Sequence, residues 1–207
     1  MRVLVAATLL LASTAQAAPS VDWARGLVIA DGIGLADRHA PNPAVARGTS
    51  RRAAEDAARK TLAAKCNDLP LARGGTVGKA ASDAAVKERL ARAVANAVTL
   101  SADPETDGSW RVTMGVPVEA VRQAIDGPRV ATEDKGPAVV VVEGVAAKPA
   151  VGWTVGGTSG ATLWVASPPA WAKDAPHVKA KAAKAGAIDV DGIDATPATL
   201  FVILTKP

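Results

Sequence analysis

Residue types that carry catalytic or metal chemistry are few in this chain of 207 residues, and they lie far apart. The two histidines, His39 and His177, belong to no H-E-x-x-H pair or similar zinc-binding spacing. We expect His39 to be an exposed loop residue and His177 to begin a helix. A Ser-His-Asp triad is assembled in space and stays open at this point, although the chain has no Gly-x-Ser-x-Gly elbow.

The single cysteine, Cys66, excludes an intramolecular disulfide. Its position near the end of an expected helix favours a small buried side chain, with an intermolecular disulfide as the alternative. A catalytic thiol is not favoured, because no histidine lies nearby in sequence. Asp189, Asp191 and Asp194 surround Gly192 but lack the later glutamate of a calcium loop. The sequence therefore predicts no catalytic residue, no cofactor and no metal site.

Two glycine-rich segments suggest nucleotide-binding loops but do not meet the requirements. Gly32-Ile33-Gly34 lacks the third small residue of the dinucleotide fingerprint, because Asp37 occupies that position and the next expected helix begins several residues later. We expect a strand bulge or a turn there instead. The segment 156–160 has no following lysine and no helix, so it predicts a plain hairpin loop.

The formal net charge is +4, and Lys and Arg are interleaved along the chain with Asp and Glu. Nucleic-acid binding needs a concentrated basic face with stacking aromatic residues, whereas this chain has one Phe, no Tyr and five scattered Trp. We therefore expect no nucleic-acid partner. Three lysines, Lys179, Lys181 and Lys184, lie on an expected helix over 176–185, where they complement the helix dipole or form a docking patch for an anionic surface or partner.

The first seventeen residues have the order of a secretory signal peptide. Arg2 precedes an apolar segment over 3–12, and an A-x-A cleavage site ends at Ala17. Ala18 stands where a bacterial lipoprotein carries its lipidated cysteine, and no later apolar run reaches the ~20 residues of a membrane span. We expect a periplasmic or secreted protein with no lipid anchor and no transmembrane segment after cleavage.

The segment 18–129 predicts an α+β domain. Asn42 followed by Pro43 is typical of a helix start, because Asn caps the first turn and Pro has no N–H to lose there. The expected elements are a strand at 23–30, a helix from 43 to about 66, a short strand at 69–72, a helix at 82–97 capped by Ser82, a hairpin of 98–102 with 110–116, and a helix at 117–125. This order favours a mostly antiparallel sheet with two main helices on one face.

Charges and apolar residues give each expected helix two faces. The first helix carries opposite charges four positions apart, as in Arg51 and Glu55, each pair adding a few tenths of a kcal/mol. Its expected buried face consists of Val45, Ala53, Ala54, Ala57, Ala58 and Leu62. The buried stripe of the second helix consists of Val86, Leu90, Ala93, Val94 and Ala97.

Residues 130–136 read as a polar linker, and 137–207 predict a smaller α+β unit with the order β-β-β-α-β. Its expected strands are 138–143, 152–155, 161–166 and 199–205, with a helix at 176–185 before the last one. The second and third strands are expected to form a hairpin. Antiparallel pairing with helices on one face is the simplest packing, so the whole chain is expected to be α+β.

One motif extends over both a strand and a helix: a strand ending in G-x-G, a proline-containing loop, and a helix with the pattern A-R-x-x-x-R-R-A-A-x-x-D-A-x-R-x-x-L. Its residues are Gly32, Gly34, Pro43, Ala46, Arg47, Arg51, Arg52, Ala53, Ala54, Asp56, Ala57, Arg59 and Leu62. This motif resembles a family of exported bacterial proteins that includes the N-terminal domain of flagellar assembly protein T and small LPP-type outer-membrane lipoproteins. Segments 110–121 and 136–151 are similar to later parts of that family.

The resemblance implies a non-enzymatic role in the cell envelope, in assembly or as a scaffold, with motility or the outer membrane as its setting. The partner would be an envelope protein or a second copy of the chain. The candidate interaction surface consists of Arg47, Arg51, Arg52, Lys179, Lys181 and Lys184. Two alternatives remain: a secreted hydrolase whose site forms only in space, and a small-ligand carrier, which requires a deep apolar pocket.

Overall fold

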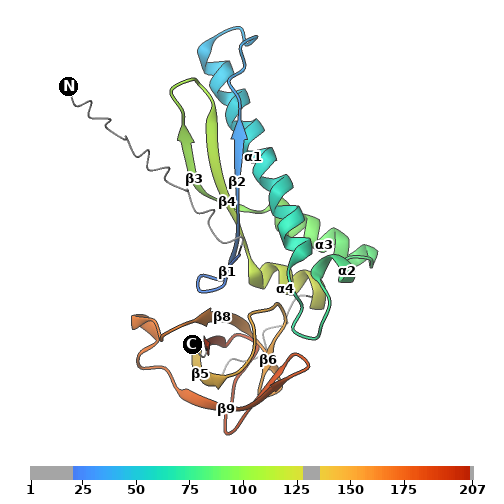
Figure 1. Cartoon of the computed structure of the whole chain (residues 1–207), viewed down its shortest axis with the longest axis vertical. Helices are drawn as coiled ribbons and strands as arrows, with labels where there is room; N and C mark the ends of the chain where they lie inside the picture. The colour runs from blue at the N-terminus through green and yellow to red at the C-terminus, as the bar shows by residue number, and fades with distance from the viewer. Residues whose placement is uncertain (1–20, 128–135, 206–207) are drawn as a thin grey trace, which may run out of the picture.

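A computed structural model describes residues 21–127 and 136–205 of the chain (Figure 1). The expected signal peptide, 1–17, and nearly all of the expected linker, 130–136, lie outside these residues. The described chain is α+β, as predicted, with an antiparallel sheet in 21–127 and a larger mixed sheet in 136–205. We call these two regions the first and second units; they follow one another along the long axis of the molecule (Figure 1).

The sheet of the first unit has the strand order β1-β2-β4-β3, with every pair antiparallel. Its strands are β1 (Val21–Asp22), β2 (Leu27–Gly34), β3 (Val98–Pro104) and β4 (Trp110–Pro117). Residues alternate between a buried and a more open face, so Val28 and Ala30 point inward while Leu27 and Ile29 do not. The predicted hairpin of β3 and β4 is confirmed.

The first helix begins where the Asn-Pro signal predicts. Asn42 caps α1 (Pro43–Asp68), and its Oδ1 accepts hydrogen bonds from the backbone N–H groups of Ala44 at 3.1 Å and Val45 at 3.0 Å. The buried stripe consists of Ser50, Ala54, Ala58, Leu62 and Cys66. Val45 and Ala53 were expected inside but are exposed, because the stripe advances in steps of four that leave both side chains pointing away from the sheet.

The Gly-x-Gly segment is neither a bulge nor a turn, which corrects the expectation from the sequence. Gly32 and Gly34 continue β2 in unbroken register with β4. A Cβ at Gly34 would lie 1.8 Å from the Ser50 carbonyl oxygen, and one at Gly32 would lie 2.0 Å from that of Ala54. Glycine is therefore required because the backbone of α1 packs directly against the strand.

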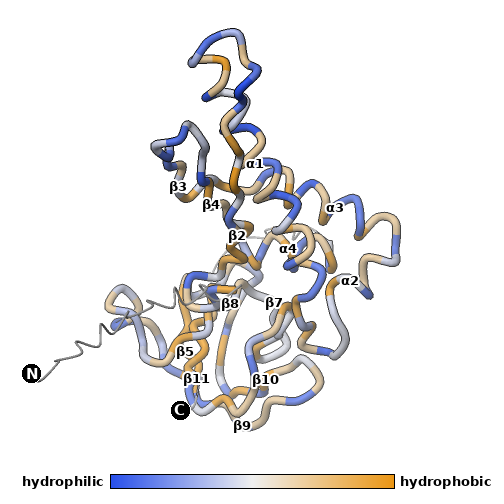
Figure 2. Tube along the Cα trace, turned by 45° about the horizontal axis from the view of Figure 1, so that its top comes forward, coloured by the Kyte–Doolittle hydropathy of each residue, from blue (hydrophilic) through white to orange (hydrophobic). Residues whose placement is uncertain are grey.

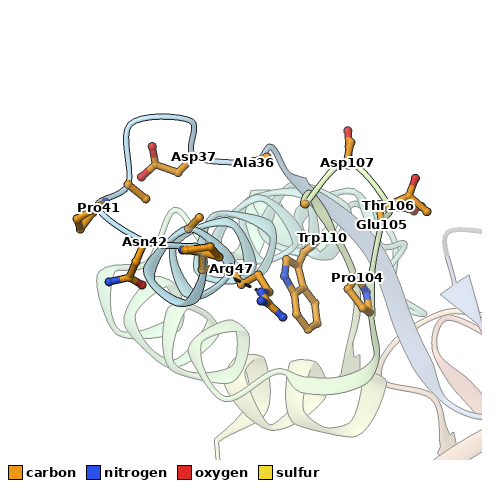
Figure 3. A pocket seen from close by; sticks show the side chains of 14 residues that line it. Ala36, Asp37, Pro41, Asn42, Arg47, Pro104, Glu105, Thr106, Asp107 and Trp110 are labelled. Atoms are coloured by element: carbon orange, nitrogen blue, oxygen red, sulfur yellow. Dashed lines mark hydrogen bonds between the residues drawn. The ribbon is translucent and has the colours of Figure 1, made fainter.

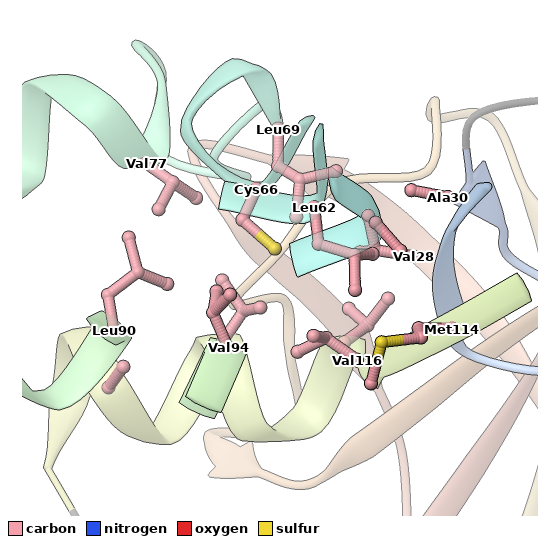
Figure 4. Close-up of a cluster of buried hydrophobic side chains, with 14 of the residues drawn as sticks. Val28, Ala30, Leu62, Cys66, Leu69, Val77, Leu90, Val94, Met114 and Val116 are labelled. Carbon is pink, nitrogen blue, oxygen red and sulfur yellow. The ribbon is translucent and has the colours of Figure 1, made fainter. Parts of the chain in front are cut away.

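Three shorter helices complete the first unit: α2 (Val77–Ala80), α3 (Ala84–Ala95) and α4 (Val118–Asp126). Asp83, one residue later than expected, caps α3 by accepting from the N–H groups of Ala85 and Val86. The expected strand at 69–72 is wrong, since this segment forms only isolated bridges before α2 begins. Figure 4 shows the resulting core, in which Leu90 and Val94 of α3 face Cys66 and Leu62 of α1.

The second unit contains seven strands in the order β7-β6-β10-β9-β5-β11-β8. They are β5 (Val139–Val145), β6 (Thr154–Val155), β7 (Thr158–Ser159), β8 (Ala161–Val165), β9 (His177–Lys184), β10 (Ala187–Val190) and β11 (Leu200–Thr205), with one 3-10 turn, η1 (Ala170–Ala172). Strand β11 runs parallel to both β5 and β8, and β5 is parallel to β9. The expected antiparallel packing is therefore wrong for this unit.

Two further expectations fail in the second unit. The segment expected as a helix, 176–185, is strand β9, held between β5 and β10. Residues 154–159 form a small hairpin of β6 with β7, whereas β8 pairs with β11 and not with β6. In both cases, pairing with strands distant in sequence determines the structure.

Large side chains fill the second unit, where Trp153 and Trp164 lie with ring centroids 6.0 Å apart beside buried Phe201. The hydrophobic stretches of β5 and β11 run side by side (Figure 2). The two units are joined by backbone hydrogen bonds, including Trp164 N–H to the Trp23 carbonyl at 3.0 Å and Ala72 N–H to the Val151 carbonyl at 2.9 Å.

Candidate functional site

The outer end of the first unit carries a groove of about 640 Å³, which we call the tip groove (Figure 3). It lies between the loop and helix start at 36–47 and the turn that joins β3 to β4. Its lining consists of Ala36, Asp37, Ala40, Pro41, Asn42, Pro43, Ala46, Arg47, Pro104, Glu105, Thr106, Asp107, Gly108 and Trp110. A groove of this size is within the range of ligand sites, and its open form also suits a protruding side chain or peptide segment.

Local hydrogen bonds fix both walls of the tip groove. On one wall, Asp37 accepts from the His39 backbone N–H at 3.0 Å. On the other wall, Asp107 accepts from the Ser109 N–H at 2.9 Å and from its hydroxyl at 2.6 Å, and these bonds lower the pKa of the Asp107 carboxyl. Gly108 has a φ of 84°, which a turn here requires. Both walls are built by Asx-type turns, so they hold their shape without a ligand.

Trp110 forms the floor of the tip groove at the start of β4. The guanidinium carbon of Arg51 lies 5.5 Å from the centroid of the Trp110 ring, a cation–π contact, while Arg51 also pairs with Glu55 at 3.2 Å. Arg47 lines the groove and donates to the Pro43 carbonyl at 3.4 Å. The indole Nε1 of Trp110 is buried and has no hydrogen-bond partner among the described residues.

Three exposed apolar side chains lie close in sequence to the segments that line this groove, although none of the three lines it. Leu35 is 77 % exposed, Ile33 is 52 % exposed and Val45 is 44 % exposed. Leu35 directly precedes the lining residue Ala36, and Val45 directly precedes the lining residue Ala46. Ile33 lies on the exposed face of β2, opposite the face on which Gly34 packs against α1. We call these three residues, together with Arg47, Arg51 and Trp110, the tip surface. Exposed large apolar residues that gather in one place are typical of a contact surface, whereas single ones are ordinary.

The six basic residues proposed from the sequence do not form one surface. Arg47 and Arg51 belong to the tip surface, and Arg52 is exposed on the same helix. The three lysines lie on β9, in the second unit, far from the start of α1 (Figure 1). Because this segment is a strand, these lysines cannot complement a helix dipole. Lys181 instead pairs with Asp191 at 2.7 Å, which raises the pKa of the lysine.

The remaining polar candidates are dispersed. His177 Nδ1 lies 2.7 Å from Glu143 Oε1 on neighbouring strands, and His39 is exposed in the loop beside the tip groove. Cys66 is fully buried, and burial raises the pKa of its thiol to about 11, so it is a packed apolar residue as expected. Among residues 21–127 and 136–205, no group of three His, Cys, Asp or Glu side chains could hold a metal ion.

Trp110, Leu35 and Ile33 were not singled out from the sequence as site residues. The pattern placed Trp110 in a hairpin strand and Ile33 in the expected bulge, and nothing indicated that the hairpin end meets the start of the helix. Trp153, Trp164 and Phe201 are buried in the core of the second unit, whereas Trp110 lies at a groove. This difference depends on contacts between segments that are distant in sequence.

No helix within the described ranges is both long enough and apolar enough to cross a membrane. In comparisons with models of protein families, with curated proteins and with solved structures, nothing matches this chain.

Proposed function

We propose that this chain is an exported, non-catalytic protein of the cell envelope that acts by contact with another protein, and that the tip surface makes this contact. The observation that carries the proposal is the exposure of Leu35, Ile33 and Val45 at the end of the first unit that also carries a groove lined by Arg47 and Trp110. Protein interfaces concentrate their binding energy in Trp, Tyr and Arg anchors surrounded by apolar contacts. The tip surface has this composition.

Export is supported by the signal-peptide order of residues 1–17. The resemblance to envelope assembly proteins agrees with a contact role in the envelope, with an envelope protein or a second copy as the partner.

Site-specific photo-cross-linking in the cells that produce the protein tests this proposal. A cross-linking amino acid at position 35 is expected to yield an adduct of one discrete mass. The control position is Lys60, which is exposed on α1. The same adducts from both positions, or none from position 35, would contradict contact through the tip surface. The mass of the adduct distinguishes a second copy from another protein.

A further inference from the structure

A second groove of about 640 Å³ lies at the other end of α1, between α1, α2 and α3. We call it the helical groove. Its lining consists of Ala63, Asn67, Gly78, Ala81, Lys87, Leu90, Ala91 and Val94. Leu90 and Val94, which are almost fully buried, form its floor and belong to the core of the first unit (Figure 4). The helical groove therefore opens directly onto the hydrophobic interior.

The groove is hollow because the residues along its sides are small. Ala63, Gly78, Ala81 and Ala91 cannot fill the space between the helices. Gly78 allows α2 to approach the end of α1, since a Cβ there would lie 3.1 Å from the Asn67 carbonyl oxygen. The sides of the helical groove are thus formed mainly by small residues, and its floor is aliphatic.

Asn67 and Lys87 are the two polar residues in the lining of the helical groove, whose other residues are apolar or glycine. Neither side chain forms an ion pair or hydrogen bond with another described residue. Among residues 21–127 and 136–205, the ammonium of Lys87 therefore has no anionic partner. A mostly apolar site with a few polar groups is the usual form of a small-molecule site, in which the polar groups orient the ligand.

We propose that the helical groove binds a monoanionic amphiphile, with its acyl chain on Leu90 and Val94 and its carboxylate paired with Lys87. The volume is within the 300 to 1,000 Å³ range of ligand sites, at roughly its middle. The charge of Lys87 favours an anionic over a neutral or cationic head, and the amide of Asn67 can donate a second hydrogen bond. This proposal is independent of protein contact at the tip surface.

Methyl NMR of the full mature chain titrated with decanoate tests the proposal. Saturable shifts are expected for the methyl groups of Ala63, Ala91 and Val94, with much weaker binding of decanol, which has the same chain and no charge. Lys87→Glu is expected to weaken decanoate binding about tenfold or more, equivalent to one lost charged contact. Lys60→Glu, an equal charge change on an exposed site of α1, should leave it unchanged.

A second variant separates loss of the site from loss of the fold. Ala91→Phe fills the groove from an exposed position, so it should abolish binding while the circular dichroism spectrum stays the same. Three results would overturn the proposal: no saturable shift up to about 1 mM decanoate, equal affinity for decanol and decanoate, or shifts produced by an amphipathic helical peptide and not by decanoate.

Discussion

The two units bury their sheets differently. In the first unit, α1 covers one face of the sheet, and the described residues leave the other face of β2 and β3 exposed or only partly covered. In the second unit, both faces of the central strands are covered: Phe201 and Ile203 point into the Trp153–Trp164 core, while Val202 packs with Ala172 on the other side. Exposed large apolar residues accordingly gather in the first unit, as Ile33, Leu35, Val45, Val98 and Leu100, against Trp171 in the second.

The second unit therefore covers both faces of its central strands, whereas most of the exposed large apolar side chains among the described residues lie in the first unit. Both grooves, at the tip and between the helices, also belong to the first unit. Its helix can approach the sheet closely only because glycine and alanine occupy the contact.

The largest effect is expected from Gly34→Ala. The new Cβ would lie within 1.8 Å of the Ser50 carbonyl oxygen, so α1 must move away from β2. We expect the free energy of unfolding to fall by about 3 kcal/mol or more in urea denaturation. The matched control, Gly48→Ala, lies on α1 with nothing within 4 Å and should stabilise by about 0.5 to 1 kcal/mol. Equal effects of the two changes would contradict direct packing of helix on strand.

A smaller effect is expected from the ionisation of Cys66. Because burial raises the pKa of its thiol from 9.0 to about 11, the folded chain keeps a proton that the unfolded chain loses above pH 9. The contribution of the protonated thiol to the free energy of unfolding is therefore fully present below pH 9. It falls by about 2 to 3 kcal/mol as the pH rises to 11. Cys66→Ala should lack this component when both proteins are unfolded in urea at pH 8 and pH 11. Identical pH dependences would show that the thiol is not held in an apolar core.

The smallest effect tests the second unit. Ala185 has a φ of 51°, and with Gly186 at 83° it forms the turn between β9 and β10. Ala185→Gly removes the strain of an alanine in the left-handed conformation. It should raise the free energy of unfolding, measured by thermal denaturation, by about 0.5 to 1 kcal/mol. In a helix, the same change would lower stability by a similar amount. The sign therefore distinguishes the β9–β10 hairpin from the helix expected from the sequence.

Local signals made the main helices and the hairpin of the first unit predictable. Asn42-Pro43 marks the start of α1, and the apolar stripe of α3 and the turn before Trp110 act within a few residues. The second unit was less predictable, because Ala and Lys in 177–184 favour a helix in isolation and become a strand through pairing with β5 and β10.

The candidate site was predictable only in part. Arg47 and Arg51 could be proposed from their places on an expected helix, but Trp110 and Leu35 join them only through folding. The helical groove gave no sequence signal either. Its alanines look like the apolar side of a helix, and the space that they leave depends on how α1, α2 and α3 pack.

Contact through the tip surface is tested most directly by measuring the affinity of the cross-linked partner, once purified, for two matched variants. Leu35→Asp and Trp171→Asp each place a charge on an exposed apolar residue, one in each unit. We predict that Leu35→Asp weakens binding about thirtyfold or more, as for an interface hot spot, and that Trp171→Asp leaves it unchanged. Loss of binding by Trp171→Asp, with Leu35→Asp unaffected, would contradict the assignment and place the contact on the second unit.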